Sequence, residues 1–500
     1  MKKVKYILAA IVLGTSLSLT SCADDFLDTI PTSEIGDETA YSTGENLMTI
    51  INGMHRNMYV RQNSSQGQNG YTAQLIVSDV LGDDVVFPST GNGWFVSTLR
   101  WLDINNESSG NIAYPWNFWY SMMRNANNVI TYGQDAGGNQ TLKNNAIGQA
   151  YAYRAFGYFQ LVQLYANRYE AGKTNSQLGV VIRLDPSPEL MEDPKERSTV
   201  EEVYKQIWSD LDQAEKQLTG ISKLHNSHFS LDNVQGLKAR VALVQQDYAK
   251  AAQYAALARK NKTLMPSEDY LKGFNDFTNK EWMWGIAIQD DQTDFFGNFH
   301  AYMSRNYNST QIRQAPKVMN HKLYAAFPTS DVRAQVVDPT GNHPDLGLPS
   351  SYSKYPYTSQ KFLTKNKDNN VALGDVPFMR VAEMYLIEAE AKYYLGDEAG
   401  SKSVLTELAQ ARDTEFTSFT TSGQAYLDEL YLHRRIELWG EGFRFFDLKR
   451  TKSALNRRDT GAVAAVINNV WEVPATDLRW TWVIPRSELN SNPLCEQNPS

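Results

Sequence analysis

The amino-acid sequence predicts a mainly α-helical protein that carries long irregular loops and a few short strands. Three observations predict this class. Residues 146–166 place aromatic and aliphatic side chains at three- and four-residue spacing, which is typical of a packed helix. A capping box of Ser198 and Glu201 opens an amphipathic segment. Two alanine-rich segments, 234–260 and 381–412, are each broken by a short polar turn and therefore indicate helical hairpins.

The start of the chain predicts a secretory signal over residues 1–21. Three lysines among the first five residues precede an apolar run that is shorter than the about 20 residues needed to span a bilayer. The run ends in Leu-Thr-Ser-Cys, which resembles the lipobox of bacterial lipoproteins, so we expect Cys22 to be acylated after cleavage before it. An ordinary signal peptide with an incidental cysteine is the alternative. The chain has only two cysteines, which favours lipidation.

Residues 22–40 form the lipidated N-terminus and an acidic tether, and residues 41–500 form the folded body. The formal net charge of the whole chain is −8, and loss of the signal removes three lysines. This acidity argues against nucleic acid as a partner and against electrostatic docking on anionic lipid. Membrane contact is therefore expected through acyl chains alone. Cys495 then has no disulfide partner, so stability must come from the core, for which 42% hydrophobic residues suffice.

Both hairpins combine small residues with a tight turn. In the first, alanines at 242, 251, 252 and 255 flank an aspartate and Tyr248, and in the second a Leu-Gly-Asp turn follows alanines at 382, 389 and 391. Small residues let two antiparallel helices approach closely, and the pattern resembles a tetratricopeptide repeat. Generic alanine-rich hairpins are the alternative. We expect tetratricopeptide-like units at about 146–260 and 375–450, packed on neighbours that bury their faces.

Two other regions differ from the hairpins in amino-acid composition. Residues 61–120 hold four tryptophans among glycine and asparagine, and residues 262–374 are rich in Asn, Gly, Pro, Tyr and Phe, with one strand-like run at 282–288. A helical scaffold that carries long aromatic loops is a common way to build a binding surface, so both are expected to be ligand-loop regions.

Several catalytic signatures are missing: a G-x-S-x-G elbow, a P-loop and an H-E-x-x-H motif. His225 and His228 are expected in an exposed polar loop, without a metal. The adjacent acids Asp83-Asp84 and Asp290-Asp291 are interpreted as solvated turns, with polar ligand contacts or a calcium site as alternatives. We predict no catalytic residue, metal ligand or cofactor.

The aromatic loops hold the candidate binding residues. Trp94 follows two glycines at the tip of Gly-Asn-Gly-Trp-Phe, and a second aromatic cluster follows at 294–307. Flat rings stack on the C–H faces of sugars while amide and charged groups bond the hydroxyls. An exposed indole costs free energy, which suggests a ligand, although a single aromatic is more often core than site. The predicted carbohydrate-binding residues are Asn92, Trp94, Phe296, Tyr302 and Arg305.

The last third of the chain carries three motifs in order. Residues 378–391 resemble the R-x-A-E…L-x-x-A-E-A helix of the SusD/RagB family, and 434–450 resemble its R-R-x-E-L-x-x-E-G-x-R-x-x-D-L-x-R segment. Residues 484–499 match its I-P…E-L…N-P…Q-N-P ending. The motifs place charges on apolar helix faces, and partly buried charges need partners. We therefore expect these residues to form a structural ion-pair network and do not assign them to a ligand.

The resemblance implies a surface-exposed outer-membrane lipoprotein of a Gram-negative bacterium, with a helical body of tetratricopeptide-like units. Such proteins are not enzymes. They capture glycans and act as the lid of a SusC-like TonB-dependent transporter. Asp24 and Asp25 resemble the signal that sends these lipoproteins to the outer face. Two alternatives remain: capture of oligopeptides, as the RagB branch implies, and a surface hydrolase.

Overall fold

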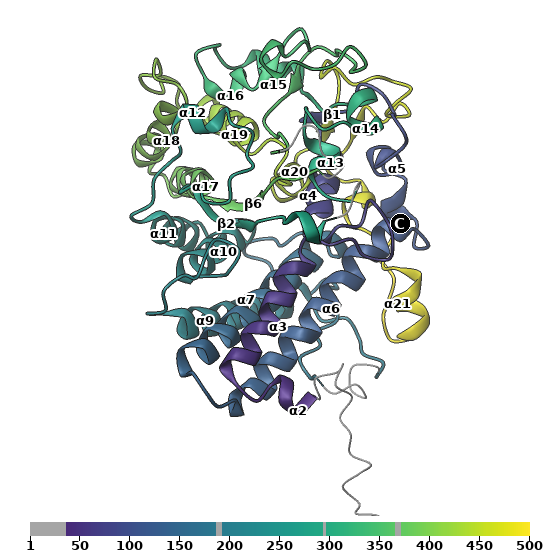
Figure 1. Cartoon of the computed structure of the whole chain (residues 1–500), viewed down its shortest axis with the longest axis vertical. Helices are drawn as coiled ribbons and strands as arrows, with labels where there is room; N and C mark the ends of the chain where they lie inside the picture. The colour runs from purple at the N-terminus through teal and green to yellow at the C-terminus, as the bar shows by residue number, and fades with distance from the viewer. Residues whose placement is uncertain (1–36, 187–192, 294–296, 366–371) are drawn as a thin grey trace, which may run out of the picture.

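The computed structural model describes residues 37–186, 193–293, 297–365 and 372–500. Figure 1 shows a mainly helical molecule, which confirms the predicted fold class. Cys22, Phe296 and the tether up to residue 36 lie outside the described residues. None of the described helices combines the length and the apolarity that a membrane crossing requires.

The first helices pack around one long central helix. In Figure 1, α3, α6, α7 and α9 occupy the lower half of the molecule, where α7 contacts each of the other three. The helices up to residue 218 are α2 (Asp37–Ala40), α3 (Gly44–Asn57), α4 (Gly70–Val80), α5 (Val96–Leu99), η2 (Asp103–Asn105), α6 (Gly110–Tyr132), η3 (Gly133–Asp135), α7 (Gln140–Tyr165) and α9 (Val200–Leu218).

Two details differ from the sequence-based expectation. The capping box of α9 is one residue later, because Thr199 rather than Ser198 is the N-cap and Glu202 closes the box. Residues 61–120, expected as loops, also contain the α4 helix, and Trp101 and Trp119 are buried in the core. Both indole N–H groups are satisfied in the interior: Trp119 donates to the Gln74 side chain at 2.7 Å, and Trp101 donates to the Leu81 carbonyl at 3.2 Å.

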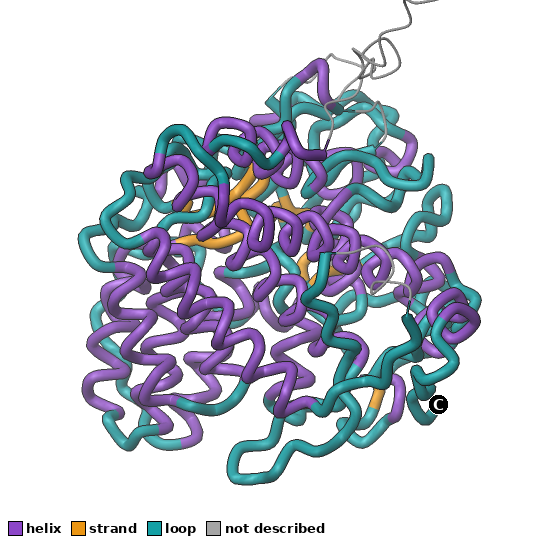
Figure 2. Tube along the Cα trace, turned by 90° about the horizontal axis from the view of Figure 1, so that it is seen from below, coloured by secondary structure: helices purple, strands orange, loops and turns teal. Residues whose placement is uncertain are grey.

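The two predicted hairpins are present and pack directly on each other. Helix α10 contacts α9 and α11, α11 contacts α17, and α17 contacts α18 and α19, so the helices form a continuous row. Figure 1 shows α10, α11, α17 and α18 along one side of the molecule, and Figure 2 shows helices packed side by side, with most of the short strands between them. The bounds are α10 (Leu231–Val244), α11 (Tyr248–Arg259), α17 (Val381–Tyr394), α18 (Glu398–Arg412), α19 (Gln424–Glu437), α20 (Arg444–Arg450) and α21 (Arg486–Ser491).

Charged and aromatic side chains join the two hairpins. Arg259 of α11 bonds Glu388 of α17 at 2.7 Å, and its guanidinium lies 4.1 Å from the centroid of the Tyr385 ring. Tyr248 stacks on Tyr394 at a centroid distance of 4.4 Å. The repeat-like units therefore bury their faces against each other although a long segment separates them in the sequence.

That intervening segment leaves and rejoins the helical body at a two-stranded ribbon. Strand β2 (Trp282–Ile286) pairs antiparallel with β6 (Val376–Arg380), which leads directly into α17. Both strands are fully buried. The ribbon therefore fixes both ends of the excursion over residues 287–375. Its short helices are η4 (Asp290–Gln292), α13 (His300–Met303), α14 (Thr310–Gln314), α15 (His321–Ala325), α16 (Val332–Gln335) and η5 (Pro344–Leu346), and α12 (Ser267–Tyr270) precedes the ribbon.

A four-stranded antiparallel sheet connects this excursion to the early loops, in the order β1-β3-β5-β4. The residue pair Val85↔Met319 joins β1 to β3. The loop that follows β1 is thereby held against the segment that precedes β3. The strands are β1 (Val85–Val86), β3 (Val318–Met319), β4 (Val337–Asp338) and β5 (Thr358–Ser359), while β7 (Leu455–Asn456) pairs with β8 (Glu472–Val473), followed by η6 (Leu478–Trp480).

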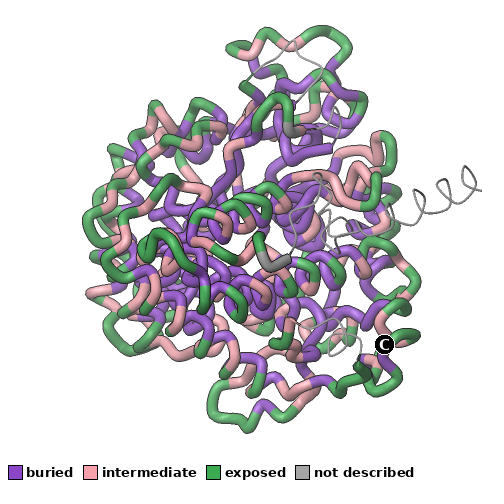
Figure 3. The backbone as a smooth tube through the Cα atoms, turned by 60° about the horizontal axis from the view of Figure 1, so that its bottom comes forward, coloured by how far each residue is buried: buried purple, intermediate pink, exposed green. Residues whose placement is uncertain are grey.

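The interior contains a network of charges as well as apolar side chains, and Figure 3 shows the buried chain running through the centre of the molecule. Arg380, Arg412 and Glu437 are at most 1% exposed. Glu437 lies 2.9 Å from Arg380 and 3.1 Å from Arg412. The predicted structural ion-pair network is therefore present, and residues outside the motifs complete it: Glu281, Asp331, Arg333 and Lys361.

Lys317, just before β3, is a buried cation without a carboxylate partner among the described residues. Its ammonium group donates to the Ala315 carbonyl at 3.0 Å and lies 4.2 Å from the centroid of the Phe87 ring. Burial lowers the pKa of Lys317 from 10.5 to about 7, because desolvation disfavours the charged form.

We expect Lys317→Met to stabilise the protein by ~1–3 kcal/mol near neutral pH, because methionine fills a similar volume without a buried charge. The unfolded chain binds the lysine proton between pH 7 and 10.5 whereas the folded chain does not. The gain should therefore be largest at or below pH 7 and vanish toward pH 10.5. Urea unfolding at pH 6.5 and pH 10 measures it, and an equal gain at both values would contradict the assignment of cost to charge burial.

Candidate functional site

A surface pocket brings together residues from three separate parts of the chain. Its volume is about 230 Å³. Two of the predicted site residues, Trp94 and Tyr302, form an edge-to-face pair across it, with ring centroids 5.9 Å apart. The complete lining is Gln66, Asn92, Trp94, Ala301, Tyr302, Ser309, Thr310 and Gln311. We call this the Trp94 pocket.

Trp94 is half-buried. Gly67 lies against its indole ring, so close that a Cβ atom there would lie 3.3 Å from two ring carbons. The next residue, Phe95, has a φ of 63°, a left-handed conformation that a bulky side chain adopts only under constraint. This conformation directs Phe95 into the core, where the centroid of its ring lies 5.1 Å from that of the Tyr302 ring. The indole at the tip of the loop is therefore held in place by its neighbours.

The loop is also anchored on helix α14. Ser89 donates to the Gln314 carbonyl at 2.6 Å, and the Asn92 backbone N–H donates to the Gln311 side chain at 3.3 Å. The Asn92 side chain is exposed. Asn92 and Trp94 thus sit on a braced loop and line the same pocket, and their contact with a ligand stays a prediction.

The structure gives the other predicted residues different surroundings. Tyr302 is 2% exposed, and its hydroxyl donates to the Gln66 carbonyl at 2.8 Å. Arg305 is 1% exposed and donates to the Ser353 carbonyl at 3.0 Å. Burial lowers the pKa of Arg305 to about 10. In this conformation Tyr302 forms the wall of the pocket, and Arg305 lies behind the surface. Phe296 falls outside the described residues.

Sequence analysis did not anticipate Gln66, Ser309, Thr310 or Gln311. These residues offer amide and hydroxyl groups around the ring pair. They lie in loops or in the short α14 helix and belong to no motif, and long-range contacts bring them beside Trp94: the β1–β3 pairing, the Asn92–Gln311 bond and the Tyr302–Gln66 bond.

The two pairs of adjacent acids, 83–84 and 290–291, differ in their burial. Asp83 and Asp84, expected in a solvated turn, are instead buried, and they pair with Arg444 and Arg435 at 2.6 Å. They belong to the structural network, since the arginine charges hold the pKa of Asp83 below its ordinary value against the opposing effect of burial. Asp290 and its neighbour are exposed in η4, as expected. Across the described ranges, histidine, cysteine and acidic side chains form no group of three or more that could hold a metal ion.

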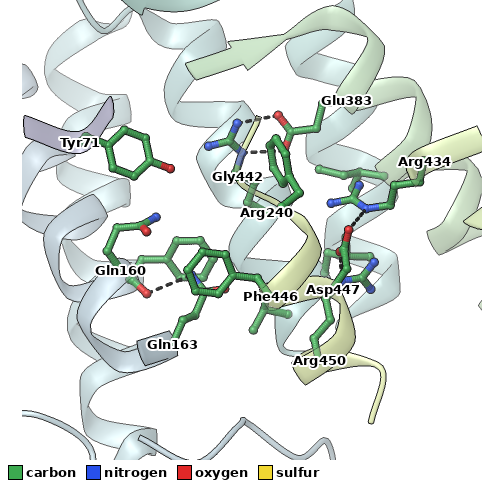
Figure 4. Close-up of a pocket in the computed structure, with 15 residues that line it drawn as sticks. Tyr71, Gln160, Gln163, Arg240, Glu383, Arg434, Gly442, Phe446, Asp447 and Arg450 are labelled. Atoms are coloured by element: carbon green, nitrogen blue, oxygen red, sulfur yellow. Dashed lines mark hydrogen bonds and ion pairs between the residues drawn. The ribbon is translucent and has the colours of Figure 1, made fainter. Parts of the chain in front are cut away.

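A second hollow, among the charged residues of the family motifs, is too small for a sugar. Figure 4 shows its lining, and its volume is about 40 Å³, close to that of one or two waters. The charges that line it are already paired: Arg240 with Glu383 at 2.6 Å, and Asp447 with Arg434 at 2.7 Å. This interior is scaffold, as the motif analysis predicted.

The helical hairpins and the long loops between them define a helical-repeat scaffold. Comparison with known proteins identifies the family. The sequence model of the SusD family matches residues 246–500, and the model described as "Starch-binding associating with outer membrane" matches residues 25–243. The chain belongs to the SusD family.

Individual relatives match this chain over nearly its whole length. SusD-like protein P38 of Formosa agariphila is 23% identical, covering 100% of this chain and 99% of the relative. The structure of a SusD-like carbohydrate binding protein from Bacteroides vulgatus superposes with a TM-score of 0.80 at 25% identity, covering 91% and 98% of the two chains. A laminarin binding SusD-like protein superposes with a TM-score of 0.67 at 20% identity, covering 92% and 100%.

Proposed function

We propose that the protein captures glycans at the cell surface and delivers them to a SusC-like TonB-dependent transporter, over which it acts as a lid. The observation that carries the capture step is the meeting of Asn92, Trp94 and Tyr302 in one surface pocket. An indole beside amide and hydroxyl groups suits a sugar, whose C–H face is apolar and whose edge is polar. Membership of a family whose members bind glycans supports the same proposal.

The pocket favours binding over hydrolysis. Glycoside hydrolysis requires a pair of carboxylic acids that flank the bond. None of the described residues that line the Trp94 pocket carries a charge. The same chemistry favours a neutral sugar unit at this position. A volume of about 230 Å³ lies below the ~300–1,000 Å³ of pockets that enclose drug-sized ligands, so the pocket would hold one unit of a longer chain.

The lid role rests on the lipid anchor and the family. Acylation at Cys22 would hold the protein on the outer membrane, the acidic tether 22–40 would leave the body free to move, and the family description supports association with that membrane. Co-purification of a large β-barrel transporter from detergent extracts tests the partnership. A protein that always runs alone, with glycan uptake intact after deletion of its gene, would count against it.

Peptide capture is the second candidate function, because aromatic loops with amide groups can also hold an extended peptide. A binding screen of neutral oligosaccharides against oligopeptides on the purified protein separates the two. Retention of at least one class of oligosaccharide, with no oligopeptide retained, is the expected result. The opposite pattern would replace glycan capture by peptide capture, and release of product from a retained glycan would instead indicate a hydrolase.

A further inference from the structure

A larger groove lies apart from the Trp94 pocket and contains three histidines. Its volume is about 750 Å³, within the range of ligand sites in proteins. His55 comes from helix α3, and His225 and His228 come from the loop after α9. The three rings form a row with His228 in the middle. The centroid of the His228 ring lies 4.2 Å from that of each of the other two rings. We call this the histidine groove.

The loop that carries two of these histidines is fixed rather than free. Asn226 accepts from the Gly285 backbone N–H at 3.0 Å and donates to the Phe277 carbonyl at 2.8 Å. Ser227 bonds the Nδ1 atom of His225 at 2.7 Å and that of His228 at 3.1 Å. The groove is thus a built feature of the fold, with both imidazoles held at the same hydroxyl.

The lining of the groove is neutral or basic. Among the described residues, no acidic side chain lines it, although the chain as a whole is acidic. Arg56 is exposed at the groove, and within the described part of the chain no carboxylate pairs with it. His55 is 6% exposed, and its Nε2 atom has no hydrogen-bond partner, while its Nδ1 atom bonds the Tyr153 hydroxyl.

We propose that the histidine groove is a second ligand site, and that it binds the carboxylate or sulfate group of an acidic sugar. Arg56 would supply the positive charge for the anion, and the exposed His225 would add to it when anion binding protonates its ring. The Asn52 oxygen already bonds His228 Nε2 at 3.0 Å, which leaves its NH2 group for a sugar hydroxyl. Gln289 offers a second amide, and the half-buried Phe277 ring offers a flat surface for the sugar face. The ligand class differs from that of the uncharged Trp94 pocket.

The clustering of the imidazoles makes binding depend on protons. Burial and the neighbouring imidazoles lower the pKa of His55 well below 6.5, and they lower the pKa of His228 to about 3. Burial and then Lys223 lower the pKa of His225. A bound anion opposes these effects and raises the imidazole pKa values, so the complex takes up protons. Affinity should therefore increase as pH falls.

The other charged and titratable groups around the cluster are few. Helix α3 contributes Arg56 and Tyr59, and helix α7 contributes Tyr153. Lys223 lies on the histidine loop, and the charge of Asp291 in η4 acts on Tyr59. Burial lowers the pKa of Lys223 to about 8, so Lys223 and the imidazoles are the groups expected to take up protons between pH 8 and 5.5 when an anion binds.

The test is isothermal titration of the purified full-length protein with three disaccharides: digalacturonate, a 6-sulfated galactobiose and neutral galactobiose. At pH 5.5 we expect at least one charged sugar to bind tenfold or more tightly than the neutral one, and tenfold or more tightly than at pH 8. The two charged sugars distinguish carboxylate from sulfate. Titrations in buffers with different ionisation heats should reveal proton uptake.

The variant Arg56→Ala/His225→Ala removes two exposed groups, so it should fold normally and lose tenfold or more in affinity for the charged sugar. Arg458→Ala, which removes an exposed arginine outside the groove, is the matched control. Equal affinity for charged and neutral sugars, an affinity independent of pH, or unchanged binding by the double variant would overturn the proposal. Failure of neutral-glycan capture at the Trp94 pocket would leave this test intact, because charged sugars are titrated separately.

Discussion

Glu437→Gln should destabilise the protein by ~3–5 kcal/mol, because it removes one charge from a buried network and leaves the partners uncompensated. Glu437 is fully buried and faces Arg380, Arg412 and Arg333. Within the described residues, this network holds four cations and four carboxylates, so its charges balance: Arg333, Arg380, Arg412 and Lys361 with Glu281, Glu437, Glu441 and Asp331. Urea unfolding at pH 7 measures the loss.

Glu472→Gln is the matched control, since the same chemical change is made in an exposed pair. Glu472 is 50% exposed and lies 2.6 Å from Arg458. Exposed pairs contribute ~1 kcal/mol or less, because water screens both charges. Equal effects of the two substitutions would contradict the idea that burial sets the cost.

Acid unfolding gives an independent view of the same residue. The three arginines hold the pKa of Glu437 well below its ordinary 4.5, despite the opposing effect of burial. Glu437 therefore contributes stability above pH 4.5, and this contribution is lost as pH falls below that value. The difference in unfolding free energy between the native protein and Glu437→Gln should shrink in acid.

A double variant separates charge balance from loss of contacts. Glu437→Leu together with Arg412→Met removes one charge of each sign and keeps similar volumes. It should cost less than the sum of the two single substitutions, because neither partner is left alone in the interior. Strict additivity would mean that the two side chains act independently, in spite of the 3.1 Å contact between them.

Local patterns in the sequence predicted the helices well because each depends on neighbours a few residues away. The bounds expected for the second hairpin match α17 and α18 closely. The capping box was placed one residue early for a physical reason. Ser198 and Thr199 are both good N-caps, and each is followed by a glutamate three residues later, so the sequence alone does not separate them.

Long-range contacts account for what sequence analysis missed. Asp83 and Asp84 resemble a solvated turn until Arg435 and Arg444, from the far end of the chain, cover them. Arg305 resembles an exposed ligand contact, but the loop that carries it folds inward and its guanidinium donates to a backbone carbonyl. Trp94 and Tyr302 were each selected from loop composition, whereas their meeting depends on the β1–β3 pairing, which no local pattern encodes.

Trp94→Ala should abolish retention of the protein on an immobilised cognate polysaccharide. The indole is half-buried on a braced loop, so little ordering is needed when a sugar stacks on it. Loss of a central aromatic contact at a binding site typically costs ~2 kcal/mol or more, which corresponds to about thirtyfold in affinity. A shallow open site starts from modest affinity, so a loss of this size removes measurable retention.

Trp208→Ala is the control for removing a tryptophan as such. Trp208 is also half-buried, and it lies on helix α9, where it contacts Tyr254 at a centroid distance of 6.0 Å. This variant should retain the glycan like the native protein. Tyr302→Phe keeps the ring beside Trp94 while removing the hydroxyl, so retention should fall only slightly. If Trp94→Ala is retained as strongly as the native protein while its thermal unfolding is unchanged, Trp94 is not a contact residue, and the glycan must bind elsewhere on the molecule.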